Sequence, residues 1–445
     1  MQDPLVLRAL DPGEAFFHMS DLVSCMNFVV FAERRGTLVP ERIRSALDTL
    51  QRENLLLQTR IIWTEANGLH FAHAPEQAIE LRCPKLDTQD WQRHVEQQLS
   101  EPFVDGAAPL MRCLYLELPA RTDDGQSPDR SVLALCFHHA IADGRSGAEL
   151  LRQLLGLMAT GTRTDEPKAA AALPPMADVH PALFRWAAQP DKAKQIRNSL
   201  IGDYRRHGPL PAIPWLATDA AGRAPRFIRL SLAPDTTQRL LTRTRDNGTS
   251  LHGALCAAQL LAQLKLHSGT EPTAFFLSCP VDMRPHLEPV PPVSPTGLFV
   301  SLISATHLVS TRTDVWELAR EVIVQTRRQI ARGEGHLFFN MYGLDGSPVL
   351  PNRLASFRQK ALASLPNTMV SNVGAIATVV DDPCVESISF ALCPMPYQTL
   401  FTAASTYQGQ LVLNVGFDAA RLTEANAELL AQGIKDILVA SVSHP

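Results

Sequence analysis

The 445-residue chain lacks the short motifs that mark most cofactor, metal and membrane proteins. It has neither a G-x-G-x-x-G fingerprint nor a phosphate-binding loop, so we expect no nucleotide cofactor. It has no H-E-x-x-H, and its eight cysteines form no C-x-x-C, so neither a zinc site nor a disulfide framework is expected. No apolar stretch approaches the roughly 18 residues of a membrane helix, and the N-terminus does not resemble a signal peptide. These absences predict a cytoplasmic protein with no permanently bound cofactor and no metal.

The composition also narrows the possible partners. The net charge is −4 and no long basic run occurs, which argues against nucleic acid and anionic membranes. Apolar residues make up 45% of the chain and charged residues 19%, an ordinary balance for a globular protein. A chain of this length is too long for one ordinary core, so it favours two domains of about 200 residues each.

Strand-like and helix-like segments alternate in both halves of the chain, which predicts an α+β protein of two similar lobes. We expect an N-terminal lobe over residues 1–175 and a C-terminal lobe over residues 176–445, with a crossover linker that begins in the Pro- and Gly-bounded stretch 160–175. A site would then lie in the cleft between the lobes. Strands are expected at 25–32, 55–63, 111–118, 131–137, 226–232, 274–279, 298–308, 368–380, 387–393, 399–406 and 410–417, and helices at 40–53, 89–99, 146–158, 177–208, 235–247, 250–267, 314–332 and 423–442.

The most informative stretch is His138-His139-Ala-Ile-Ala-Asp143-Gly144, which connects an expected strand to an expected helix. A connection of this kind aims side chains into a cleft, and an imidazole can accept a proton near neutral pH. The alternative is a buried histidine pair held by backbone hydrogen bonds. The coincidence of two histidines, a spaced aspartate and a glycine favours a catalytic base.

Two roles are open for Asp143. It could orient the imidazole of His139, as the acid of a catalytic triad does. It could instead brace the loop by pairing with an arginine, because a guanidinium matches a carboxylate in two-pronged geometry. Arg284, at the end of an expected strand in the other half, is the candidate partner, and bracing is the favoured interpretation. Otherwise Arg284 is a solvated loop cation.

Other polar residues are weaker candidates. Ser371 and Asn372, in Ser-Asn-Val-Gly374, have side chains that can donate hydrogen bonds to an oxyanion, although a polar bend in a strand is the favoured explanation. His18 could line a pocket, but an ordinary core or surface histidine is the simpler interpretation. Gly144-Arg-Ser146-Gly147 is one residue short of G-x-S-x-G, so the sequence does not support a serine hydrolase.

The H-H-x-x-x-D-G string at 138–144 resembles the motif of the CoA-dependent acyltransferase superfamily. That superfamily includes chloramphenicol acetyltransferase, condensation domains of nonribosomal peptide synthetases and polyketide-associated acyltransferases. Segments 10–17, 55–61, 101–112, 281–284 and 371–374 resemble further landmarks, so the likeness covers nearly the whole chain.

The resemblance implies two chloramphenicol-acetyltransferase-like lobes that form a V, with a tunnel along their interface. His139 would be the catalytic base, His138 a supporting residue, and Asp143 chiefly structural through Arg284. The donor would be a thioester of phosphopantetheine, on an acyl carrier protein or on CoA. The acceptor would attack the thioester directly, without an acyl-enzyme.

Two departures refine this expectation. The D-F-G-W-G motif of plant acyltransferases is absent, and Ser371–Gly374 looks more like the alcohol-acylating, polyketide-associated branch than like peptide-forming condensation domains. We therefore expect a free-standing, monomeric enzyme that transfers an acyl group from a carrier protein to a small-molecule hydroxyl. The alternatives are a CoA thioester as the donor, an amine as the acceptor, or a recruitment module without catalytic activity.

Overall fold

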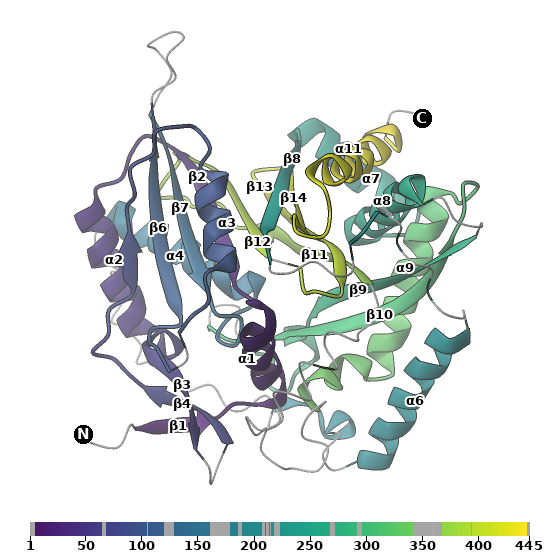
Figure 1. Cartoon of the computed structure of the whole chain (residues 1–445), viewed down its shortest axis with the longest axis horizontal. Coiled ribbons are helices and arrows are strands. Elements are labelled where there is room, and N and C mark those ends of the chain that lie inside the picture. The colour runs from purple at the N-terminus through teal and green to yellow at the C-terminus, as the bar shows by residue number, and fades with distance from the viewer. Residues whose placement is uncertain are drawn as a thin grey trace.

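The computed structural model describes residues 5–64, 68–104, 106–119, 129–160, 179–185, 189–206, 210, 213, 215–217, 223–267, 272–291, 296–340, 359, 367–392 and 394–442. They form two lobes side by side, each built on its own sheet (Figure 1). Within the described residues, no helix combines the length and apolar character needed to cross a bilayer.

The first lobe is built on a five-stranded sheet of order β12-β2-β7-β6-β5. Its middle strand, β7, leads directly into the histidine motif and is almost wholly buried, because helices cover both faces of the sheet. A strand covered on both faces carries a continuous apolar run rather than an alternating one, which explains its sequence SVLALCF. The strands are β2 (Phe28–Arg35), β5 (Glu80–Arg82), β6 (Met111–Leu118), β7 (Arg130–Phe137) and β12 (Val385–Leu392).

Helices α2 (Pro40–Glu53) and α4 (Gly144–Thr160) pack against each other, and α4 also packs on β2, β7 and β12. In α2 the buried residues Ile43, Ala46, Leu47 and Leu50 recur at helical spacing, and Pro40 occupies the first turn, where its missing N–H costs nothing. Helix α3 (Gln92–Ser100) contacts the sheet through β2 and β7.

The second lobe is built on a six-stranded sheet of order β10-β9-β11-β13-β14-β8. Helix α8 is apolar almost all round because it is buried between this sheet and the helices α9 and α11. The strands are β8 (Pro225–Leu232), β9 (Thr273–Asp282), β10 (Val300–Val309), β11 (Asn367–Ile376), β13 (Gln398–Tyr407) and β14 (Gln410–Asp418). The helices are α6 (Pro190–Arg206), α7 (Pro234–Asp246), α8 (Leu251–Leu266), α9 (Val315–Ala331) and α11 (Glu424–Ala440), with short 3₁₀ turns η2 (Ala182–Phe184), η4 (Arg284–His286), η5 (Glu334–His336) and η6 (Phe338–Asn340).

The helix α1 (Pro12–Ser24) lies at the junction of the two lobes (Figure 1) and packs against η6 of the second lobe. It begins with a capping box in which Asp11 accepts hydrogen bonds from the Gly13 and Glu14 amides and Glu14 accepts one from the Asp11 amide. Neither this helix nor the small sheet β1-β4-β3 was predicted from the sequence as a unit. That sheet consists of β1 (Val6–Ala9), β3 (Thr59–Thr64) and β4 (Gly68–His73).

One strand crosses between the lobes. β12 belongs to the C-terminal half of the sequence but pairs antiparallel with β2, so the first sheet includes residues beyond the expected division at 175/176. The crossing region is also held by Arg229 of β8, which forms an ion pair with Glu33 of β2 and donates hydrogen bonds to Ser387 and Ser389 of β12. The C-terminal half of the chain therefore supplies an edge strand to the sheet of the first lobe.

The expected fold class, an α+β protein of two lobes, is confirmed, and most expected elements lie within a few residues of their predicted bounds. Residues 55–63, expected as one strand, instead form a 3₁₀ turn η1 (Leu55–Gln58) followed by β3, because buried Leu56 and Leu57 close the end of α2. β11 ends at Ile376 rather than at residue 380, after the left-handed Gly374 and a break in its register with β13. The expected linker 160–175 lies, apart from residue 160, outside the described residues.

Candidate active site

The histidine motif forms the tight connection between β7 and α4 at the centre of the first lobe. At two glycines, Gly144 and Gly147, the backbone of this segment lies so close to neighbouring side chains that a Cβ would meet them. A Cβ on Gly144 would lie 3.0 Å from Cγ1 of Val373 in β11, and a Cβ on Gly147 would lie 2.9 Å from the ring of Phe28. At Gly144 the motif thus packs closely against the second lobe's sheet, where a side chain would press on Val373.

The Asp143 carboxylate is buried and both of its oxygens are engaged. Oδ1 accepts hydrogen bonds from the Ser146 amide at 2.9 Å and from Arg284 Nη2 at 3.2 Å. Oδ2 accepts one from the Phe299 amide at 2.9 Å and lies 3.1 Å from Arg284 Nη1. The Asp143 amide also donates to the carbonyl of Gly297. These contacts tie the motif loop to the second lobe.

Arg284 lies in η4, directly after β9, and is 3% exposed, so it is a buried group rather than a solvated loop cation. Besides Asp143, it donates to Asp282 Oδ1 at 2.9 Å and to the Ser146 hydroxyl at 2.7 Å, and its guanidinium lies over the ring of Phe299. Burial alone would lower its pKa, but the charges of Asp143 and Asp282 outweigh burial and raise it. The structure thus brings together Asp143 and Arg284.

The His139 ring lies between two aromatic rings. Phe17 of α1 stacks on it with centroids 3.9 Å apart and an interplanar angle of 13°, and the ring of Phe28 lies at 4.8 Å. Burial lowers the pKa of His139 to about 4, against the opposing effects of the backbone of His139 and Ala142 and the charge of Asp143. The imidazole is therefore neutral at neutral pH. The Nδ1 atom of His139 is shielded from solvent and has no hydrogen-bond partner within the described residues. Nε2 is therefore the nitrogen that a substrate would meet.

The His138 ring contacts polar side chains of α1. Its Nδ1 accepts a hydrogen bond from the Ala140 amide at 3.1 Å, so in the neutral ring Nε2 carries the proton. This Nε2 lies 3.4 Å from Nδ1 of His18 and 3.8 Å from Oδ2 of Asp21. Burial, and then the neighbouring His139, lower the pKa of His138 to about 3. His138 is thus part of a buried polar network that links the motif to α1.

Ser371 and Asn372 lie on β11, whose next residue, Val373, contacts Gly144 as described above. Both side chains are half-buried. Asn372 Oδ1 accepts a hydrogen bond from the Gly374 amide at 2.9 Å, so the amide NH₂ of Asn372 is the part that remains for a substrate. The structure therefore brings this strand to the motif loop.

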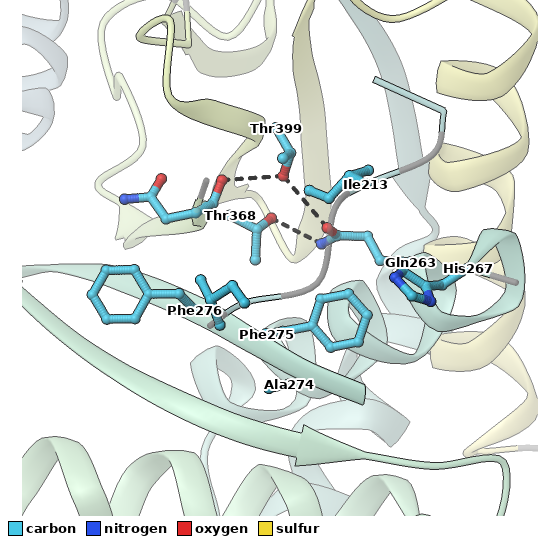
Figure 2. A pocket seen from close by; sticks show the side chains of 10 residues that line it. Ile213, Gln263, His267, Ala274, Phe275, Phe276, Thr368 and Thr399 are labelled. Atoms are coloured by element: carbon cyan, nitrogen blue, oxygen red, sulfur yellow. Dashed lines mark hydrogen bonds between the residues drawn. The ribbon is translucent and has the colours of Figure 1, made fainter. Parts of the chain in front are cut away.

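One pocket of the second lobe lies apart from the motif (Figure 2). Apolar and polar side chains line it in equal number, and some of the polar ones bond to one another, such as Gln263 with Thr368 and Thr399. None of its lining residues belongs to α1, β7 or the motif loop. The pocket therefore adds nothing to the site around His139.

Sequence reasoning missed the contribution of α1. Phe17 stacks on His139, and Asp21 completes the network of His138, yet only His18 had been considered, as a pocket residue. A signal was present in the sequence, because Asp11, Pro12 and Glu14 predict the start of a helix on which residues 17, 18 and 21 share one face.

Comparison with solved structures shows the class of fold. Polyketide synthase associated protein 5 from Mycobacterium tuberculosis matches with a TM-score of 0.67 and 19% identity, covering 99% of each chain. A trichothecene 15-O-acetyltransferase from Fusarium sporotrichioides matches at 0.70 and 14% over 98% of this chain and 95% of the other. The first condensation domain of the CDA synthetase matches at 0.70 and 15% over 100% and 97%. The fold is therefore that of condensation domains and related acyltransferases.

Comparisons of sequence agree with this class. Residues 221–415 match the family described as the C-terminus of phthiocerol/phthiodiolone dimycocerosyl transferase. The enzyme of that name from Mycobacterium tuberculosis (strain ATCC 25618 / H37Rv) is 27% identical over 331 residues, which are 74% of each chain. A plipastatin synthase from Bacillus subtilis (strain 168) is 24% identical over 65% of this chain and 10% of its own length. These sequence matches are to enzymes of the kind that the histidine motif resembles.

Proposed function

We propose that the protein transfers an acyl group from a phosphopantetheine thioester, carried by an acyl carrier protein, to a small-molecule hydroxyl and so forms an ester. The observation that carries this proposal is the neutral, shielded imidazole of His139, held on a loop that both lobes fix. A base of this kind suits an acceptor with a labile proton. Phosphopantetheine enters this proposal as part of the substrate.

In the proposed reaction, His139 Nε2 removes the proton of the acceptor hydroxyl while the oxygen attacks the thioester carbonyl. The tetrahedral intermediate collapses with cleavage of the C–S bond, and the protonated His139 returns the proton to the departing thiolate. The products are an ester and a free thiol, and no acyl group is attached to the protein. The negative charge of Asp143 raises the pKa of His139 and so favours the imidazolium that forms during this step.

Asp143 and His138 act in this scheme as positioning residues. Because both oxygens of Asp143 are engaged by Ser146, Phe299 and Arg284, its contacts hold the loop rather than the imidazole. His138, through His18, connects the same loop to α1. These contacts support a base whose location depends on elements from both lobes.

Ser371 and Asn372 are the residues we propose to stabilise the oxyanion of the intermediate. The contact of Val373 with Gly144 brings β11, the strand of Ser371 and Asn372, to the motif loop. Asn372 bonds the Gly374 amide through its oxygen, so its NH₂ group can donate to a substrate. Such a donor contributes only if it lies about 3 Å from the oxygen as the charge develops. We further propose that donor and acceptor approach His139 from opposite ends of a tunnel between the lobes.

The hydroxyl acceptor is supported by relatives and structural neighbours named as dimycocerosyl transferases and as a 15-O-acetyltransferase. A second function, amide formation, is favoured by the likeness to plipastatin synthase and to condensation domains. Parallel assays with an alcohol and the amine of the same carbon skeleton separate the two, since the faster acceptor identifies the reaction. A matched assay with acyl-CoA and acyl carrier protein identifies the donor.

The test of the mechanism is His139→Ala, assayed by intact-mass detection of product with a panel of loaded carriers and alcohols. Loss of a general base lowers the rate by about 10²–10⁴-fold. His70→Gln is the matched control, because His70 is another buried histidine of the first lobe, on β4, and bonds only the carbonyl of Gly68 among the described residues. Acyl transfer by His139→Ala at a rate near that of the unmodified protein would refute the proposal.

A further inference from the structure

A second group of chemically reactive side chains lies inside the second lobe, away from the histidine motif. His252 and Cys256 are one turn apart on α8, and Cys279 lies on the neighbouring strand β9. Cys256 Sγ is 3.5 Å from His252 Nε2 and 3.9 Å from Cys279 Sγ. The three potential ligand atoms all lie within 4.8 Å of one another. Two sulfurs and an imidazole nitrogen therefore converge on one point.

Two of the three spacings, both measured from Cys256, match the edges of a metal tetrahedron. With Zn–S bonds of about 2.3 Å and Zn–N bonds of about 2.0–2.1 Å, tetrahedral ligands lie roughly 3.8 Å apart for two sulfurs and about 3.6 Å for sulfur and nitrogen. The observed separations of 3.9 Å and 3.5 Å agree with both values. A disulfide requires sulfurs about 2.05 Å apart, so Cys256 and Cys279 are present as thiols.

The chemistry of the ligands selects the ion. Thiolate and imidazole groups prefer zinc over calcium or magnesium, which prefer carboxylate and carbonyl oxygens. The two cysteines are buried, at 0% and 3% exposure, whereas His252 is half-buried and gives an ion a way in. We propose that His252, Cys256 and Cys279 bind one Zn²⁺ ion, with the fourth position left for water or another small ligand.

Close packing and strand pairing hold the two elements that carry this site. At the start of α8, a Cβ on Gly253 would lie 2.7 Å from the carbonyl oxygen of Ala319 in α9, so the helix turn that carries His252 is held closely against its neighbour. Cys279 is fixed by the pairing of β9 with β10, where it lies opposite Ile303. Ligands held in this way lose little freedom on binding.

The site would connect two parts of the second lobe. An ion would join α8 to β9 only three residues before Asp282, and β9 leads on to Arg284, the partner of Asp143. Bound zinc would therefore stabilise the strand that holds the motif loop. No metal was expected from the sequence, because no cysteine pair has the usual close spacing. Cys256 and Cys279 are 23 residues apart, and only the fold brings them together.

The first experiment measures zinc in protein purified without an affinity tag and without chelator, by mass spectrometry of the metal. We expect close to one zinc per chain, because a preformed thiolate site retains its ion. After removal of the ion with a chelator, adding Zn²⁺ at 100 times its dissociation constant would raise Tm by about 3 °C, if the chain unfolds as one unit. Protein that contains no zinc and shows no rise in Tm on its addition would overturn the proposal.

Variants then locate the ion. Cys279→Ser and His252→Gln should each lose the zinc and the rise in Tm, whereas Cys113→Ser should keep both, because Cys113 is an equally buried thiol on β6 of the other lobe. His252 is half-buried, so its variant provides the result if a buried serine impairs folding. Binding of Co²⁺ to the unmodified protein, followed by its thiolate-to-metal absorption, reports the ligands without any substitution. Zinc retained at full affinity by Cys279→Ser and His252→Gln would refute the site.

Discussion

The bracing role of Asp143 makes a specific prediction for Asp143→Asn. An asparagine of the same shape carries one oxygen and one NH₂ group in place of two oxygens. Whichever way the amide turns, its NH₂ meets donors: the Ser146 amide and Arg284 Nη2 on one side, or the Phe299 amide and Arg284 Nη1 on the other. The substitution therefore loses at least two hydrogen bonds to a buried charge and leaves Arg284 with one buried carboxylate fewer.

The magnitude follows from these contacts. Hydrogen bonds to charged groups contribute about 1.5–3 kcal/mol each, and breaking a buried ion pair costs about 3–5 kcal/mol, so we expect a loss of about 3–5 kcal/mol in the free energy of unfolding. With an unfolding entropy of about 2.1 cal/mol/K per residue, the whole chain has about 0.9 kcal/mol/K, and Tm falls by about 3–5 °C. Activity should fall together with stability, because the loop that carries His139 loosens.

The assay compares Tm and the rate of thiol release for Asp143→Asn and for Asp282→Asn. Asp282 also bonds Arg284 and pairs with Arg145, but its side chain is 21% exposed and does not touch the motif carboxylate, so Asp282→Asn should cost less than Asp143→Asn, about 1–2 kcal/mol. If Asp143 instead orients the imidazole, Asp143→Asn would lower the rate by about 10⁴-fold and leave Tm within about 1 °C of the unmodified protein. That pattern would refute the brace.

Three further predictions concern the same loop. Burial holds the pKa of His138 at about 3 and that of His139 at about 4. A histidine in the unfolded chain has a pKa of about 6.5, so the stability that the two neutral histidines contribute is complete above that pH and declines as the pH falls toward 4. At pH 5 the loss in the free energy of unfolding is about 2 kcal/mol per histidine. A Tm that does not fall between pH 7 and pH 5 would contradict this prediction. Gly147→Ala places a Cβ against the ring of Phe28 and should cost about 1–3 kcal/mol in a denaturant titration, whereas an unchanged midpoint would show that the ring can move away. Phe17→Leu removes the ring stacked on His139, an interaction that contributes about 0.5–1.5 kcal/mol. We expect kcat to fall roughly 2- to 10-fold with KM unchanged, and the acid limb of the pH profile to move to higher pH. A change in KM alone would instead make Phe17 a substrate-binding residue.

The local elements of this fold can be predicted from the sequence because their signals are local. The buried strand β7, the glycine-punctuated turn and the amphipathic α4 are each recognisable within about 30 residues, and together they place His139 on a strand-to-helix connection. Arg284 was predicted as the partner of Asp143, 141 residues away, from its place at the end of an expected strand, and the likeness to a known motif supported the pair. No periodicity could have provided that pair.

Other features depend on which segments meet in space. β12 has the pattern of a strand of the second half, yet its antiparallel partner is β2, because strand order within a sheet is not encoded in the alternation of a single strand. The apolar residues of α1 likewise indicate a buried face without indicating its neighbour, so the stacking of Phe17 on His139 could not be predicted. The polar residues Asp21 and His18 become meaningful only once α1 is known to lie beside His138.

The two lobes contribute different things to the motif loop. Of the rings against His139, that of Phe28 belongs to the first lobe and that of Phe17 to α1 at the junction, whereas the groups that hold Asp143 belong mainly to the second lobe, to η4 and the segment before β10. His139 and Asp143 are only four residues apart, so a movement of one lobe against the other cannot leave both sets of contacts intact. Parting the lobes at this loop would expose the buried pair of Asp143 and Arg284, at a cost of several kcal/mol. The loop therefore fixes the relation between the lobes as well as the location of the His139 imidazole, and a substitution on either side of the interface should change the surroundings of His139.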